Sequence, residues 1–151
     1  MGQSIEIEIK GEEGLLKANQ LANFLYYFRA AYFVAVDRFG NVPVDQLRGH
    51  ELYFRSEMQK AIAESLNRRK VWELCFADLG DNELLVNAIS RNSPYKILSM
   101  GLITALVLAV IVSGGEVDLY NGKFVLNPLG EGIAALRDAF NPPDQTFSPS
   151  P

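Results

Sequence analysis

The feature that most constrains this chain is an uncharged segment, residues 97–115, with the sequence ILSMGLITALVLAVIVSGG. As one helix it would be about 28 Å long at about 1.5 Å per residue, just enough for a hydrocarbon core of about 30 Å. Such a helix either crosses a membrane or must be covered on all sides by the rest of the chain. Ser93 and Pro94 form a suitable N-cap and first-turn pair, so the sequence predicts a long, wholly apolar helix over about 94–113.

The distribution of charge around this segment favours a membrane span. Of the 14 Lys and Arg residues, 12 precede Ile97, and two, Lys123 and Arg137, follow Gly115. By the positive-inside rule, the N-terminal part would be cytoplasmic and the C-terminus would lie on the other side. The N-terminus has neither a basic region nor an apolar signal sequence, so the chain is expected to be uncleaved. We therefore predict a membrane-anchored protein.

Residues 116–151 support the alternative of a soluble cytoplasmic domain. They contain an amphipathic hairpin and an amphipathic helix but no cysteine, and so short a piece cannot build a core of its own. Its apolar faces would instead cover residues 97–115. In this alternative the segment is the buried core helix of a homo-oligomeric α+β domain.

Small side chains recur at every fourth position of the segment, at Gly101, Ala105, Ala109 and Ser113. A stripe of this kind lets two helix backbones approach closely, in lipid or in a protein core. We predict self-association through these four residues. The competing interpretation is a contact within one chain, with a helix expected over 15–38 in which Ala18 and Ala22 are also four residues apart.

The remaining residues predict one α+β domain over residues 1–140, in which helices pack against an antiparallel sheet. The N-terminal strand is indicated by Ile5, Ile7 and Ile9, which alternate with charged residues. A β-hairpin is expected over residues 70–90, because alternating apolar residues flank a turn-forming sequence.

A second hairpin is expected over residues 116–126. Its turn is Asn121-Gly122, a strong signal for a two-residue turn with positive φ at both positions. The Pro-rich residues 141–151 are expected to form a flexible tail. Periodic apolar residues predict helices over residues 15–38, over residues 44–67 and from about residue 129.

The residues capable of catalysis do not form a recognisable set, and we predict a non-enzymatic protein without cofactor or metal. His50 is the only histidine and Cys75 the only cysteine, which excludes a structural zinc site. We expect Cys75 to pack as a small apolar residue and His50 to be solvated at a helix start. Asp78, Asp81 and Glu83 could bind a hard cation, but such residues are also typical of a turn.

The net charge of −4 argues against a nucleic-acid partner. The expected partners are a second copy of the chain or another protein and, for a spanning segment, membrane lipid. Arg68, Arg69 and Lys70 are predicted to be a solvated helix end, although a membrane protein could use them to contact anionic lipid. A cluster of aromatic residues predicts core packing, with a cavity for a small ligand or an enzyme as a third interpretation; these are Tyr26, Tyr27, Phe28, Tyr32 and Phe33.

Overall fold

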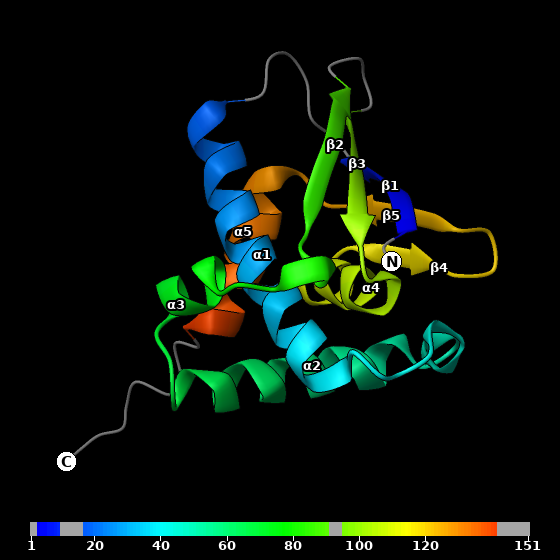
Figure 1. Cartoon of the computed structure of the whole chain (residues 1–151). Helices are drawn as coiled ribbons and strands as arrows, with labels where there is room; N and C mark the ends of the chain where they lie inside the picture. The colour runs from blue at the N-terminus through cyan, green and yellow to red at the C-terminus, as the bar shows by residue number, and fades with distance from the viewer. Residues whose placement is uncertain (1–2, 10–16, 91–94, 142–151) are drawn as a thin grey trace.

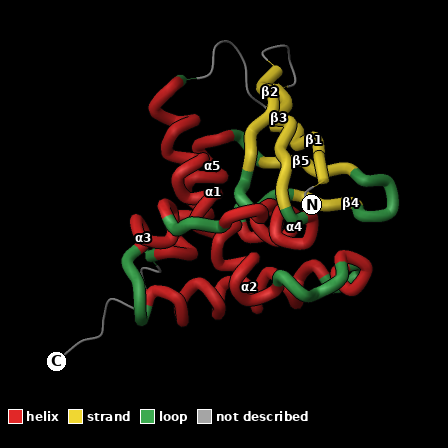
Figure 2. The backbone as a smooth tube through the Cα atoms, in the orientation of Figure 1, coloured by secondary structure: helices red, strands yellow, loops and turns green. Residues whose placement is uncertain are grey.

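The computed structural model describes residues 3–9, 17–90 and 95–141, so nearly all of the predicted C-terminal tail lies outside the described residues. Helices occupy the left side and the base of the molecule in Figure 2, and the strands lie together at the upper right. The strands are β1 (Gln3–Ile9), β2 (Leu85–Ser90), β3 (Tyr95–Gly101), β4 (Glu116–Asp118) and β5 (Lys123–Leu126). The α-helices are α1 (Ala18–Phe39), α2 (Glu51–Leu66), α3 (Val71–Phe76), α4 (Ile103–Val112) and α5 (Leu129–Phe140), with short 3-10 turns at Val44–Leu47 and Gly80–Asn82.

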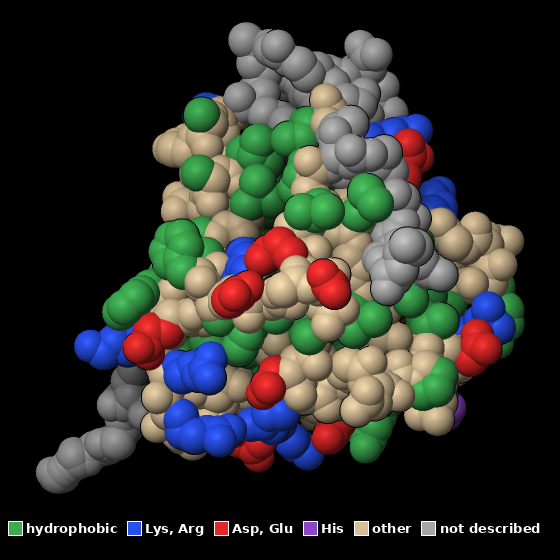
Figure 3. Space-filling view, viewed as in Figure 1, with side chains coloured by type: hydrophobic (Ala, Val, Ile, Leu, Met, Phe, Trp, Pro, Cys, Tyr) green, Lys and Arg blue, Asp and Glu red, His purple; other side chains and the backbone are tan. Residues whose placement is uncertain are grey.

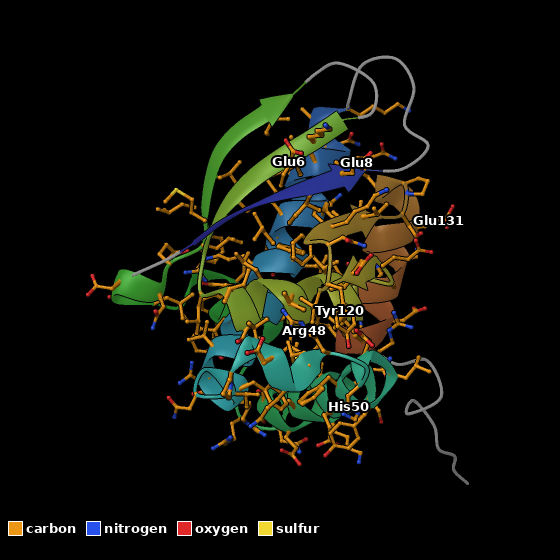
Figure 4. The ribbon with its side chains drawn as sticks, turned by 90° about the vertical axis from the view of Figure 1, so that its right-hand side faces the viewer. Glu6, Glu8, Arg48, His50, Tyr120 and Glu131 are labelled. Atoms are coloured by element: carbon orange, nitrogen blue, oxygen red, sulfur yellow. The ribbon has the colours of Figure 1, made fainter. Side chains whose placement is uncertain are left out.

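The strands form one sheet in the order β2-β3-β1-β5-β4, which confirms the predicted α+β class. Strand β1 lies at the centre, antiparallel to β3 and parallel to β5, so the sheet is mixed and not purely antiparallel as predicted. Ile5, Ile7 and Ile9 are buried on its inner face, as their alternation predicts. Glu6 and Glu8 project from β1 on the other face, where Glu6 pairs with Lys96 of β3 at 3.6 Å (Figure 4).

The uncharged segment is not one helix, which corrects the prediction for residues 94–113. Its first part is strand β3, Leu102 follows, and the helix α4 has only 10 residues. At about 1.5 Å per residue α4 is about half as long as a bilayer core is thick. In the described part of the chain, no helix combines the length and the apolar character that a membrane crossing needs. The predicted membrane anchor is therefore wrong.

The apolar composition of α4 has a different cause: the helix is enclosed by the rest of the chain. Every residue from Thr104 to Val112 is buried. One side of α4 packs on the sheet, and α1, α2 and α5 pack around the others (Figure 1). A central helix in such a position has no solvent-facing side that would require polar residues. The expectation of a buried core helix is thus correct for residues 103–112.

The hairpin predicted over residues 70–90 is also wrong, because its first half is the helix α3. The Lys70 backbone N–H donates to Glu73 Oε1 at 2.8 Å, which caps the start of this helix. Leu74 and Cys75 are buried while Trp72 and Phe76 are exposed. An alternation of only three apolar residues fits a short helix as well as a strand.

The second hairpin is confirmed, with Val117 of β4 opposite Phe124 of β5. Gly122 has a φ of +66°, but among the described residues only glycines have positive φ, so the prediction for Asn121 is wrong. Helices α1 and α5 also agree with the sequence predictions. The helix expected over residues 44–67 is interrupted near Gly49, whose φ of +75° ends the first 3-10 turn before α2 begins.

Candidate functional site

The most exposed apolar part of the sheet is its edge strand β2. This strand, LVNAIS, has no charged residue, and within residues 3–9, 17–90 and 95–141 it pairs with β3 on one side only. Leu85 is 52% exposed and Val86 is 40% exposed. In the side view of Figure 4, β2 is the outermost green strand and curves away from the helices. A β-bulge between Val86 and Ala88 interrupts its register with β3. We refer to β2, with its unpaired side and these two side chains, as the β2 edge.

The β2 edge is exposed because the helical layer does not extend beneath it. Helix α4 packs against β1, β3, β4 and β5, whereas among the described elements β3 is the only one against which β2 packs extensively. Val86 lies opposite Ser99 of β3, on the inner face of the sheet. Ser99 is buried at 2% exposure, but Val86 one strand further out is not. The face that is core at β3 is therefore exposed to solvent at Val86, although Ile89 further along β2 is partly buried against the core.

The segment that leads into β2 is held in place by Arg29 of α1. Arg29 donates from Nε and Nη2 to both carboxylate oxygens of Glu83, at 2.9 and 2.6 Å. The same guanidinium donates to the backbone carbonyls of Cys75 and Ala77, each at 2.6 Å, and of Leu74 at 3.3 Å. A bidentate pair with additional carbonyl acceptors uses the full set of guanidinium donors. Arg29 thereby fixes α3 and the start of β2 to the rigid helix α1.

Tyr32, one turn further along α1, makes a second contact of this kind. Its hydroxyl donates to the Asn82 carbonyl and accepts from the Leu102 backbone N–H at 2.9 Å. The side chain is fully buried, and this burial raises the pKa of Tyr32 above its ordinary value. The tyrosine therefore connects the turn before β2 to the start of the central helix.

Hydrophobic side chains gather over β2 and the adjoining part of α1 in the space-filling view, with acidic groups beneath them (Figure 3). Trp72 and Phe76 of α3 are also exposed. The Phe76 ring packs edge-on against the Tyr26 ring of α1, with a distance of 6.3 Å between the ring centroids. The chain segment from α3 to β2 thus carries four large apolar side chains that solvent reaches.

The four residues predicted to mediate self-association lie inside the chain and on different elements. Ala105 and Ala109 are in α4, Gly101 ends β3, and Ser113 caps α4. All four are buried. A Cβ at Gly101 would lie 2.6 Å from Tyr32 Oη, so this glycine permits the close approach of α1. Self-association through the stripe stays a prediction, and a second copy would have to reach residues that one chain encloses.

A contact of α4 with α1 within the chain was the competing interpretation, and these two helices do pack together. The small residues of α1 that are buried are not the expected ones, however. Ala18 and Ala22 are exposed, whereas Ala30, Ala31 and Ala35 are buried. The close approach therefore occurs along the second half of α1.

The structure does not bring the possible catalytic residues together. His50 is exposed at the start of α2 (Figure 4), whereas Cys75 is buried in α3, beyond the far end of α2. Burial raises the pKa of the Cys75 thiol, an effect that Arg29 opposes and Glu83 reinforces. The thiol is therefore protonated at neutral pH, whereas a nucleophilic cysteine needs the thiolate.

Two of the three acidic residues of the predicted turn, Asp78 and Glu83, have other partners. Glu83 pairs with Arg29, and Asp78 Oδ1 accepts from the Gly80 backbone N–H at 2.9 Å, as in a local turn. Within the described ranges, no group of three or more His, Cys, Asp or Glu side chains is arranged to hold a metal ion. Of the aromatic cluster, Phe28 and Tyr32 are core residues, as expected.

Comparison with known proteins finds no protein family that matches this chain, and no curated protein or solved structure that matches it. The fold and its surfaces are therefore the basis for assigning a function.

Proposed function

We propose that this protein is a homotypic interaction domain in which two copies pair through their β2 edges. The observation that carries the proposal is an edge strand without charge whose Leu85 and Val86 are exposed. Unpaired strand edges of this kind are templates for pairing with another strand. Antiparallel pairing of two β2 strands would join the two sheets into one.

A second copy is the occupant that this edge fits best. A two-fold axis makes the contact self-complementary, so one surface serves both partners. Since β2 has no charged residue, no register of the pair places like charges opposite each other. The chain carries a net charge of −4, which makes most other contacts between two copies repulsive. The uncharged edge is where two such molecules can approach.

The expected affinity is modest. Burying an exposed Leu or Val side chain contributes about 1.5–3 kcal/mol, and Leu85 and Val86 are already about half buried. In a two-fold dimer each side chain is buried once in each copy, so its contribution to the binding free energy is doubled. The loss of rotational and translational freedom on association opposes this favourable free energy. The bulge also shortens the backbone ladder that the edge can form. We therefore expect a dimer whose dissociation constant lies in the micromolar range.

Sedimentation velocity from about 1 µM to about 1 mM tests the proposal. We expect the wild type to pass from monomer to dimer, and Val86→Lys to stay monomeric because two ammonium groups would enter the interface. Leu52→Lys is the matched control, since Leu52 is 77% exposed on α2 and should leave dimerisation unchanged. A wild-type chain that is monomeric throughout, or variants that behave alike, would overturn the proposal.

The proposed role is binding and not catalysis. It is supported by the buried, protonated thiol of Cys75 and by the position of His50, which precedes α2 whereas Cys75 lies beyond the other end of that helix. We therefore expect His50→Ala to leave dimerisation unchanged in the same experiment.

A further inference from the structure

The junction of α2 and α3 carries two adjoining cavities that the β2 edge does not involve. The smaller, about 200 Å³, is lined by Phe33, Asp37, Ser65, Arg68, Arg69 and Leu74. The larger, about 560 Å³, has four charged residues in its lining, Arg68, Arg69, Lys70 and Glu73, together with the aromatic residues Tyr27 and Phe140. We call the larger one the α2–α3 cleft. Its volume is within the usual range of small-molecule sites.

The charges of the α2–α3 cleft favour an anion. Three cationic side chains and one carboxylate line it, which leaves two positive charges on a protein whose net charge is −4. Lys and Arg side chains gather over this region at the lower left of Figure 3. In the part of the chain that the structure describes, the side chains of Arg68 and Lys70 have no ion pair, and both are exposed. Their donors are free to bind a ligand.

The third cation is positioned by an aromatic ring. The Arg69 guanidinium lies over the Phe33 ring, 5.4 Å from its centroid, in the smaller cavity. This cation–π contact lies where Arg69 lines both cavities. Among the described residues Arg69 forms no ion pair, so its guanidinium N–H groups stay available for an anion.

Two aromatic rings also line the α2–α3 cleft. They belong to Tyr27 of α1 and Phe140 of α5, with a distance of 6.0 Å between the ring centroids and an angle of 42° between the ring planes. A helix C-terminus favours cations through its dipole, which accounts for basic residues after α2. The dipole does not account for the two aromatic rings that line the same cavity.

We propose that the α2–α3 cleft binds a small dianionic phosphate monoester that carries a flat aromatic ring. The phosphate would be held by Arg68, Arg69 and Lys70, since guanidinium groups match phosphate oxygens in pairs and two negative charges balance the cleft. The ring would pack against Tyr27 and Phe140. This site goes beyond the proposed dimerisation and does not depend on it.

Isothermal titration calorimetry of the full chain at low salt, with phenyl phosphate as the probe, tests this site. Inorganic phosphate carries the phosphate group of the probe without the ring, and benzyl alcohol carries an aromatic ring without the phosphate. We expect phenyl phosphate to bind at least about tenfold more tightly than inorganic phosphate, and benzyl alcohol to bind more weakly than both. Added salt should weaken the binding of both phosphates.

Variants assign the binding to the cleft. Arg68→Gln and Lys70→Gln should each weaken phenyl phosphate by about tenfold. Lys60→Gln removes a charge from the exposed surface of α2, outside the cleft, and should have no effect. Tyr27→Leu should remove the advantage of phenyl phosphate over inorganic phosphate while leaving the affinity for inorganic phosphate unchanged. Melting curves of each variant check that the fold is intact.

Three results would overturn the proposal. The first is that phenyl phosphate does not bind saturably, and the second is that Lys60→Gln weakens it as much as Arg68→Gln does. The third is that vesicles containing phosphatidylserine bind while phenyl phosphate does not, which would assign the basic residues to a membrane surface. None of these results bears on the β2 edge, which Val86→Lys tests separately.

Discussion

Strands β2 and β4 are the two edges of the same sheet, and they expose their unpaired backbone very differently. Strand β4 has three residues, two of which, Glu116 and Asp118, are acidic. If two β4 strands paired about Val117, each Glu116 would lie opposite an Asp118 of the other copy, which is unfavourable. Strand β2 has six residues and no charge. Short, charged edges resist pairing, so one edge of this sheet is protected and the other is open.

The two edges also differ in how the chain holds them. Beside β4, Asp118 accepts hydrogen bonds from the Tyr120 and Asn121 backbone N–H groups, at 3.1 and 3.2 Å, in an exposed turn. The segment before β2 is instead bound by Arg29, whose side chain is only 18% exposed. The uncharged β2 edge is thus held in place by a charged side chain, Arg29, that is mostly buried. If this difference matters, damage near β2 should cost far more stability than changes near β4.

The largest expected effect is that of Arg29→Met. The change leaves Glu83 and three backbone carbonyls without their donor; removal of one partner from a fully buried ion pair costs about 3–5 kcal/mol, and for this part-buried pair we expect a loss toward the lower end of that range. Urea unfolding of the variant should show this loss in the free energy of unfolding. Arg38→Met on the same helix is the control, since Arg38 pairs with the exposed Glu64 and should lose less than about 1 kcal/mol. Equal losses would mean that Arg29 does not anchor the β2 segment.

Tyr32→Phe should have the next largest effect. It removes the hydroxyl that joins Asn82 to Leu102 and should cost about 1–3 kcal/mol at neutral pH. Because burial raises the pKa of Tyr32 in the folded state, its contribution is complete below the unfolded pKa, ordinarily 10.0. The contribution is then lost as the pH rises through the folded pKa. Urea unfolding at neutral and alkaline pH should show a smaller alkaline loss in the variant than in the wild type.

The sequence contained a signal for Arg29, but not its partner. From Phe24 to Val36 it is the only charged residue of a helix that must be covered, and a buried charge requires an opposite charge and hydrogen-bond acceptors. Glu83 lies 54 positions further along the chain. Nothing in the local sequence connects the two, so only the folded chain identifies the pair.

The uncharged segment shows where hydrophobicity alone is insufficient. Residues 97–115 join most of the sheet strand β3 to the enclosed helix α4, with one residue between them. A buried strand and a buried helix in direct succession have the same composition as one long span. Strand β3 lacks the alternation that its neighbour β1 shows, so its pattern gave no sign of a strand.

Which strand forms an edge also could not be predicted. Strands β2 and β3 are similarly apolar in sequence, yet β3 is covered and β2 is not. Edge position follows from strand order, and strand order depends on pairing between distant segments such as β1 and β5. The charged residues of β4 were the one local indication of an edge that the sequence offered.

The smallest expected effect is that of Glu116→Lys, which tests whether charge protects the β4 edge. Asn121 Nδ2 donates a hydrogen bond to Asp118 at 2.7 Å. This hydrogen bond is the largest cause of the lowered pKa of Asp118, so the Asp118 carboxylate stays ionised. The ammonium group introduced by the substitution would then face Asp118 of a second copy, twice by symmetry. Opposite charges across two exposed strands attract only weakly, so β4 association should strengthen by about tenfold at most.

Sedimentation in a Val86→Lys background, where the β2 edge is closed, measures the effect of Glu116→Lys on the β4 edge alone. Glu131→Lys, on the exposed surface of α5 (Figure 4), makes the same change in net charge and should not promote association. In the background with an intact β2, Glu116→Lys should give assemblies larger than a dimer, because each copy would then have two edges that pair with themselves. A double variant that stays monomeric at about 1 mM would show that the three-residue length of β4, and not its charge, keeps that edge closed.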